Sequence, residues 1–106
     1  PLPEAEGVQS HYPERFDREM GCTEDDWLRW LPGAVGDNFW KLQQGSAGVR
    51  IGDGALGLKW QTGEPREIGL VRMPRLLVQF RFAGVDEVAR HAFMARFDLF
   101  MQRGGG

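Results

Sequence analysis

Residues 75–101, RLLVQFRFAGVDEVARHAFMARFDLFM, decide the predicted fold, because they join a strand to the longest amphipathic stretch of the chain. Apolar side chains alternate over residues 75–82, and this period of two is typical of a strand with one buried face. Gly84 then breaks the run, and Asp86 is a suitable N-cap for a helix over residues 86–102.

Spacings of three and four place an apolar stripe on this helix. We expect the stripe to contain Val88, Ala92 or Phe93, Phe97 and Phe100. Phenylalanines on one helix face need a large apolar partner, and the nearest one is the strand face made of Leu76, Val78, Phe80 and Phe82. Burying each side chain of this size stabilises the fold by about 1.5–3 kcal/mol, so the helix is predicted to cover one face of a sheet.

Upstream of this pair, short alternating runs are separated by turn residues, which predicts further strands. These strands are expected at residues 38–43, 48–51, 55–61 and 66–73, with 75–82 as the fifth. Met73-Pro74 is expected to turn the chain between the last two. No helical run separates the strands, so the sequence predicts an antiparallel meander.

A shorter helix is predicted before the sheet, over residues 24–31. Thr23 is a suitable N-cap, and Asp26 three residues later completes an approximate capping box. Pro32-Gly33 is expected to end this helix. The predicted class is therefore α+β, with the helix, the five-stranded antiparallel sheet and the long C-terminal helix in that order.

The domain organisation follows from these elements. Residues 23–103 are expected to form a single globular domain. Residues 1–22 are expected to be an extended or partly ordered lead, in which residues 13–20 could form a short helix opened by a proline. Residues 104–106 are three glycines and are expected to be a flexible tail.

Composition limits the class of protein. The chain has 106 residues, 42% of them apolar, and a net charge of −2, which is typical of a globular domain. No apolar run is long enough for a membrane helix, and a mildly acidic chain is a poor candidate for non-specific nucleic-acid binding. The single Cys22 excludes an intrachain disulfide, so we expect a reducing, cytoplasmic location.

A mixed apolar and basic surface is predicted on the sheet face opposite the long helix. A turn at Met73-Pro74 would pair strand 66–73 with strand 75–82. The predicted contact surface then consists of Arg66, Ile68, Leu70, Arg72, Arg75, Leu77 and Arg81. Exposed apolar bands usually mark contacts, so we expect this surface to be covered by the helix carrying Trp27 and Trp30, by a second copy of the chain, or by a ligand or another partner.

Several patterns that resemble catalytic motifs have simpler explanations. Residues 52–57 match Gly-x-Gly-x-x-Gly, but a strand rather than a helix is expected to follow, so a hairpin turn is favoured. His11 and His91 are too few for a histidine metal cluster. The acids at residues 24–26 are explained by the helix dipole. Cys22 lies before a helix start, which could lower its pKa, although a buried or inert thiol is favoured.

The sequence therefore favours a small, non-catalytic interaction module without a cofactor or metal, contacting a protein partner or its own twin. Trp27 and Trp30 are added to the predicted contact residues because their helix is rich in aromatic side chains. The alternative is a small-molecule-binding protein or accessory enzyme, with an aromatic pocket between the sheet and the C-terminal helix. No motif identifies a substrate or ligand.

Overall fold

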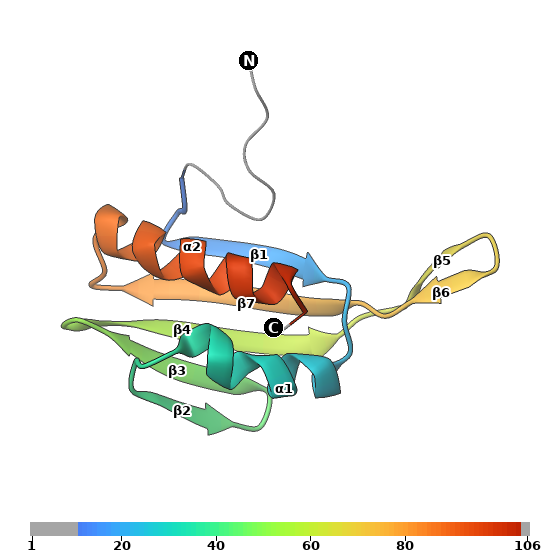
Figure 1. Ribbon diagram of the computed structural model, residues 1–106, viewed down its shortest axis with the longest axis horizontal. Helices are drawn as coiled ribbons and strands as arrows, with labels where there is room; N and C mark the ends of the chain where they lie inside the picture. The colour runs from blue at the N-terminus through green and yellow to red at the C-terminus, as the bar shows by residue number, and fades with distance from the viewer. Residues whose placement is uncertain (1–10, 105–106) are drawn as a thin grey trace, which may run out of the picture.

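The computed structural model describes residues 11–104 (Figure 1). Its strands are β1 (Arg15–Met20), β2 (Trp40–Gln43), β3 (Ser46–Ile51), β4 (Gly54–Thr62), β5 (Arg66–Ile68), β6 (Val71–Met73) and β7 (Leu76–Ala83). Its helices are α1 (Glu24–Val35) and α2 (Glu87–Gln102). The predicted α+β class is confirmed, and so is the long C-terminal helix.

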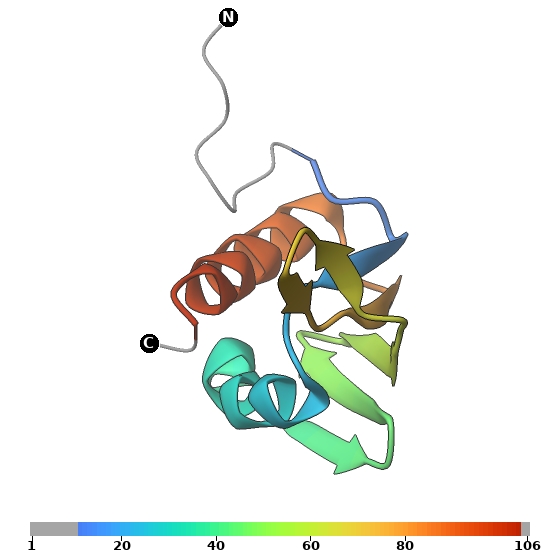
Figure 2. The same ribbon diagram turned by 90° about the vertical axis from the view of Figure 1, so that its right-hand side faces the viewer.

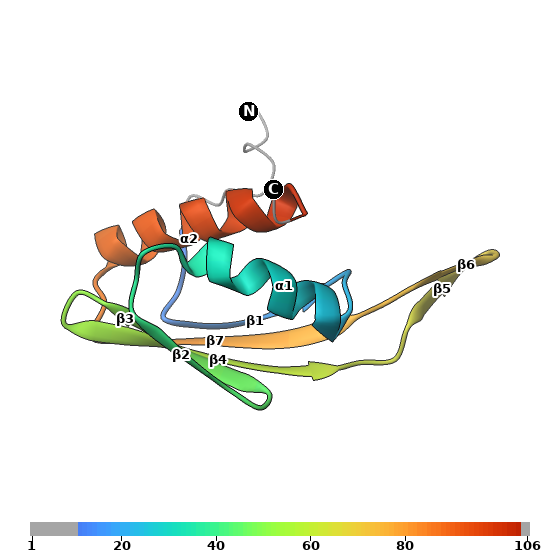
Figure 3. The same ribbon diagram turned by 60° about the horizontal axis from the view of Figure 1, so that its bottom comes forward.

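The main sheet has five antiparallel strands in the order β1-β7-β4-β3-β2. Both helices lie on one face of this sheet, so the domain has two layers (Figures 2 and 3). The opposite face of the sheet, called here the open face, carries no helix or strand of the described residues. Strands β5 and β6 pair only with each other and project beyond one end of the sheet (Figure 1).

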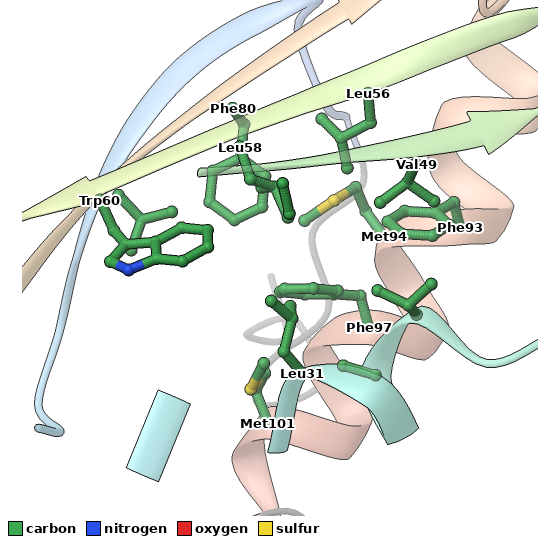
Figure 4. Packing of buried hydrophobic residues seen from close by; sticks show 14 of the residues in the cluster. Leu31, Val49, Leu56, Leu58, Trp60, Phe80, Phe93, Met94, Phe97 and Met101 are labelled. Carbon is green, nitrogen blue, oxygen red and sulfur yellow. The ribbon is translucent and has the colours of Figure 1, made fainter. Parts of the chain in front are cut away.

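The core lies between the sheet and the two helices, as Figure 4 shows. Phe97 of α2 contacts Phe80 of β7 edge to face, with 5.7 Å between the ring centroids. Trp27 of α1 makes a similar contact with Phe97 at 6.0 Å. Contacts of this geometry add to the energy of burial. The prediction that Phe93 and Phe97 cover the sheet is therefore confirmed.

Val88 does not belong to the buried stripe, because 80% of its surface is exposed. The stripe instead runs through Arg90, Phe93, Met94, Phe97, Asp98 and Met101. At about 100° per residue, Val88 lies roughly 140° around the helix from Phe93. Phe100 is half-buried and packs over Gly33 of α1, where an added Cβ would collide with its ring.

The expectation for the lead, residues 1–22, is wrong for the part that adjoins the domain. Residues 13–20 do not form a helix, since β1 occupies residues 15–20 and pairs with β7 as an edge strand. Phe16 stacks on Phe80 with 4.6 Å between the ring centroids. The alternation of half-buried and exposed residues along β1 is hidden in the sequence by charged residues on both faces. Predictions for residues 1–10 fall outside the described part of the chain.

The fourth predicted strand, 66–73, is two strands. Gly69 has a φ of 61° and, with Leu70, forms the two-residue turn between β5 and β6. Glycine at this position suits a type II′ turn, which closes a hairpin. The pairing of Leu70 with Leu77 therefore does not form, and β7 pairs instead with β4 and β1.

Helix α1 begins as predicted, because Thr23 Oγ1 accepts a hydrogen bond from the Asp26 backbone N–H at 3.0 Å. It does not end at Pro32-Gly33 but continues to Val35. Ala34 and Val35 are both buried, and their packing outweighs the helix-breaking tendency of proline and glycine. The helix ends at Gly36, whose positive φ of 70° favours glycine.

Candidate interaction surfaces

The ribbon of β5 and β6, with its flanking residues 63–75, is called here the arm. Directly paired residues of antiparallel strands share one face. Pairing of Arg66 with Met73 and of Ile68 with Val71 therefore places these four side chains together. The exposed fractions are 60% for Ile68, 59% for Val71 and 42% for Met73. The arm thus presents an apolar face to solvent with an arginine at its edge.

The other face of the arm is charged. Glu67 and Arg72 are paired across the strands, and their Oε2 and Nη1 atoms are 3.8 Å apart. An exposed pair of this kind contributes little to stability. Leu70 stands at the tip with its side chain fully exposed, at 106% of the reference area. The ribbon is therefore amphipathic, and no other element within residues 11–104 covers its apolar side.

The root of the arm lies where the main sheet ends. Thr62 of β4 and Met20 of β1 both pair with Leu76 of β7 at this point. Glu19 accepts a hydrogen bond from Arg66 at 3.2 Å and lies 3.6 Å from an Arg75 nitrogen. These contacts hold the root of the arm against the edge strand β1.

Carboxylates gather at this same end of the molecule, which is called here the acidic end. It consists of Glu19, on the open face of β1, and of Glu24, Asp25 and Asp26, in the first turn of α1 on the helix side of the sheet (Figure 3). Trp60 Nε1 of β4 donates a hydrogen bond of 2.8 Å to the Glu24 carboxylate, which connects the start of α1 to the sheet at the acidic end. The hydrogen bond from Arg29 holds the pKa of the Asp26 carboxyl below its usual value, and the bonds to Thr23 act in the same direction.

The open face is polar and mainly basic. Register and burial place on it Arg15, Lys41, Arg50, Lys59 and Arg81, with the acids Asp17 and Glu19. A hollow of about 490 Å³ lies on it, with Lys59, Gln61, Leu77 and Gln79 among its lining residues. Its lining therefore combines the apolar side chain of Leu77 with amide groups and with the charged side chains of Asp17, Glu19 and Lys59.

The residues of the predicted contact surface are not all neighbours. Arg66, Ile68, Leu70 and Arg72 lie on the arm, and Arg75 lies at its root. Leu77 and Arg81 lie on the open face, where Arg81 binds Asp17 at 2.9 Å and the backbone oxygen of Phe16 at 3.1 Å. The surface expected from one flat hairpin is thus divided between the arm and the sheet.

The two tryptophans of this prediction belong to α1, which packs beside α2 and not on the open face. Trp27 is fully buried in the core, edge to face with Trp60 at 5.5 Å. Trp30 is half-buried and packs against the same core. The expectation that this helix covers the sheet face opposite the long C-terminal helix is therefore wrong. The aromatic side chains that were expected to line a pocket between sheet and C-terminal helix fill that space with core contacts.

A buried polar cluster that the sequence did not reveal joins β1 to α2. Asp98 accepts a hydrogen bond from the Tyr12 hydroxyl at 2.7 Å and two from the Arg18 guanidinium at 2.5 and 2.9 Å. Arg18 also lies over the rings of Phe16 and Phe80, about 5 Å from their centroids. The only signal in the sequence was one aspartate inside the apolar stripe of the C-terminal helix.

The remaining candidate motifs have structural roles. Residues 52–53 form the turn between β3 and β4, residues 54–57 are the start of β4, and no helix follows them. Burial, and secondarily the Asp26 carboxylate, raise the pKa of the Cys22 thiol, so the expected effect of the helix dipole does not prevail. His11 Nδ1 lies 2.7 Å from Glu87, and His91 packs against Tyr12. Over residues 11–104, no group of three or more acidic, histidine or cysteine side chains could hold a metal ion.

Neither helix of the described segment is long and apolar enough to cross a membrane. No family model, curated protein or solved structure matches this chain.

Proposed function

We propose that this domain is a non-catalytic interaction module that holds a protein partner through the apolar face of the arm. The observation that carries the proposal is the exposed row of Ile68, Val71 and Met73 on one side of a projecting two-stranded ribbon. Contiguous apolar surface of this kind usually marks a binding site in a soluble domain.

The low stability expected of an isolated hairpin gives a second reason for a partner on the arm. A two-stranded hairpin is marginal in water and becomes stable when another element packs on its hydrophobic face. The arm has no such element within residues 11–104, because β5 and β6 form a sheet of their own. A bound partner would supply the missing layer. Arg66 at the edge of the apolar row fits this role, since arginine and large apolar side chains are enriched at interfaces.

Photocrosslinking from the tip of the arm tests this proposal. The photoreactive amino acid p-benzoylphenylalanine is placed at position 70 in the full chain, and at position 88 as a control, because Leu70 and Val88 are both highly exposed apolar residues. We expect a discrete protein adduct from position 70 that Val71→Asp abolishes, and none from position 88. Absence of a discrete adduct at position 70 in the cells that express the protein would contradict an arm-mediated contact.

A small-molecule site is the second candidate, and the hollow on the open face favours it. Its volume of about 490 Å³ is in the range of ligand pockets, and Lys59 offers a cationic anchor beside the amides of Gln61 and Gln79. The carboxylates of Asp17 and Glu19 also line the hollow, so a zwitterionic metabolite such as an amino acid is the class that this lining suits. A thermal-shift screen of amino acids and related zwitterions should give a stabilising compound whose effect is lost in Lys59→Glu. A screen with no such compound removes this candidate.

A further inference from the structure

The part of the open face formed by β2, β3 and β4 is positively charged. Register places Lys41, Arg50 and Lys59 on it, one from each strand, and all three are exposed. Within residues 11–104, none of these three side chains makes an ion pair or a hydrogen bond. Both helices lie on the other side of the sheet (Figure 3), so this charge faces solvent.

Carboxylates lie away from this part of the face. The two on the open face, Asp17 and Glu19, belong to the edge strand β1 and are paired with arginines. Between residues 38 and 61 the sequence has three basic residues and one acid, Asp53, which lies in the turn between β3 and β4. The net charge of −2 makes nucleic acid a poor ligand for the chain as a whole, but it does not describe this face.

The floor of the charged area is bare backbone. Gly48 of β3 and Gly57 of β4 are directly paired, and both are exposed. An added Cβ on Gly48 meets nothing within 4 Å. Glycine inside a strand often marks the close approach of a ligand, and a planar group can lie directly on the sheet here. A hollow of about 260 Å³ adjoins the pair, and its lining includes Ser46, Gly57, Lys59, Gln79 and Arg81.

An exposed aromatic ring lies near this floor. The backbone oxygen of Phe39 accepts a hydrogen bond from the Arg50 N–H at 2.8 Å, which continues the pairing of β2 with β3. Because Trp40 packs against the core, the preceding side chain of Phe39 points to the open face. This ring is 67% exposed, so it offers a surface on which a nucleic-acid base can stack.

The three cations surround the paired glycines. With strands about 4.8 Å apart and a rise of about 3.4 Å per residue, the Cα of Lys41 lies about 8 Å from that of Arg50 and about 12 Å from that of Lys59. The charges are therefore spread over the face and do not converge on one point. A ligand with negative charges along its length suits this arrangement better than a single small anion.

From these features we infer that the open face binds single-stranded nucleic acid. Its phosphates lie against the three basic side chains, while its bases lie on the paired glycines and on the ring of Phe39. Proteins hold single strands without sequence preference by this combination of positive charge and aromatic stacking. An acidic peptide would satisfy the cations but would leave the bare floor and the ring unused. The inference goes beyond the proposed function, because the arm takes no part in it.

Fluorescence anisotropy of a labelled 12-nucleotide single strand gives the first test, with the full chain titrated to 200 µM at 50 mM salt. We expect saturable binding with a dissociation constant in the micromolar range. Lys41→Gln and Arg50→Gln should each weaken it at least threefold. Neither residue lines the larger hollow of the open face, so a metabolite site there is left intact. Arg103→Gln is the matched control, since it removes the same charge from an exposed residue at the end of α2, and it should change the affinity less than twofold.

The salt dependence of binding counts the phosphate contacts. For a single strand, the logarithm of the binding constant falls by about 0.7 per contact for each tenfold rise in salt, so three cations predict a slope of about −2. Lys41→Gln and Arg50→Gln should each reduce the slope to about −1.4, and Arg103→Gln should leave it unchanged.

Two further variants test the floor and the ring without changing the charge. Gly48→Ile places a side chain on the floor where nothing in the fold obstructs it, and it should weaken binding at least fivefold. Phe39→Leu should weaken binding at least threefold. Thermal unfolding verifies that both variants are folded. Poly-glutamate should displace the labelled strand only at a charge concentration at least tenfold above that of an unlabelled strand.

The outcomes decide between ligands. Absence of binding at 200 µM overturns the inference, and so does binding that Lys41→Gln and Arg50→Gln leave unchanged. If poly-glutamate competes as well as an unlabelled strand and Gly48→Ile has no effect, the face is a site for acidic peptides and the nucleic-acid assignment falls. A duplex that binds as tightly as the single strand contradicts the stacking of bases. None of these results depends on the adduct from position 70, so this inference and the proposed function are tested separately.

Discussion

Asp98 is the side chain that fastens the edge strand β1 to α2. It is only 6% exposed, and its two carboxylate oxygens are occupied by the Tyr12 hydroxyl and the Arg18 guanidinium. Its partners lie 80 and 86 residues away in the sequence. No local pattern could therefore have predicted the cluster, although an acid in an apolar helical stripe indicates that some partner exists.

Replacement of Asp98 by alanine should be one of the most destabilising single changes in the domain. Breaking a buried charged pair by removing one partner costs about 3–5 kcal/mol, and the value here should be near the lower limit because Arg18 retains 20% exposure. Tyr12→Phe removes one hydrogen bond to a charged group and should cost about 1.5–3 kcal/mol. Urea unfolding measures both, with the exposed Asp37→Ala as the control. Equal effects of Asp98→Ala and Asp37→Ala would contradict this role.

Cys22 should be an unreactive thiol in the folded protein. Burial raises its pKa above the ordinary value of 9.0, with a smaller contribution from the Asp26 carboxylate. Iodoacetamide at pH 8 should therefore modify the native chain at least tenfold more slowly than the chain unfolded in urea. Modification at the same rate in both states would show that the thiol is accessible.

The raised pKa of Cys22 also predicts how the stability of the domain depends on pH in the alkaline range. Because the pKa of Cys22 is higher in the folded state than in the unfolded state, the unfolded chain loses its proton first as the pH rises. This contribution to the free energy of unfolding is complete below the unfolded-state pKa and declines as the pH rises through the folded-state pKa. In Cys22→Ala the decline should be smaller, as urea titrations at pH 7 and pH 10 would measure. An identical decline in both proteins would contradict the assignment.

Among the elements, the turn between β3 and β4 depends on a close approach of two backbones. An added Cβ on Gly54 would collide with the carbonyl oxygens of Ala83 and Gly84 at the end of β7. Gly54→Ala should therefore destabilise the domain by about 1–3 kcal/mol, since backbone atoms must move. Gly48→Ala is the matched control in β3, where the added Cβ meets nothing within 4 Å. Thermal unfolding should show a loss only for the first variant.

Local sequence signals predicted the elements well where the backbone alone decides them. The N-caps Thr23 and Asp86 were recognised, and the alternation over residues 75–82 marked β7 correctly. The signals failed where packing outweighs propensity. Pro32 does not end α1, because the buried residues after it extend the helix.

Strand pairing was harder to predict than the strands themselves. Gly69 in the middle of an apolar run is the single residue that divides the fourth strand into β5 and β6. β1 was missed because Arg15, Asp17 and Glu19 give its exposed face the composition of a loop or helix. The expected turn at Met73-Pro74 paired residues 66–73 with β7, whereas β7 lies between β1 and β4.

At the scale of the whole molecule, the arm should be removable without loss of the fold. Thr62 and Leu76 are directly paired, so an Asn-Gly dipeptide can replace residues 63–75 as a two-residue hairpin turn. The arm contributes no residue to the buried core of the described chain. We expect a folded chain whose Tm, measured for monomeric protein, lies within about 5 °C of the original. Failure of this chain to fold would show that the arm stabilises the sheet.

The arrangement of the whole chain also explains why the predicted contact surface is divided between the arm and the open face. Local patterns carry no information on which sheet face each helix covers. α1 lies in the connection between the two edge strands β1 and β2, and this connection crosses the sheet on the face where α2 also lies (Figure 1). The identity of these edge strands depends on β1, which the sequence did not reveal. Only the apolar and arginine composition of the surface could be read in advance.

The cluster around Asp98 has a consequence for synthesis of the protein on the ribosome. β1 leaves the exit tunnel before the other strands, yet Arg18 must wait for Asp98, which is translated 80 residues later. At about 5–20 residues per second, this delay is roughly 4–16 seconds. Until it ends, the nascent chain holds a guanidinium without its carboxylate, and the edge strand is fastened only when the last helix has emerged.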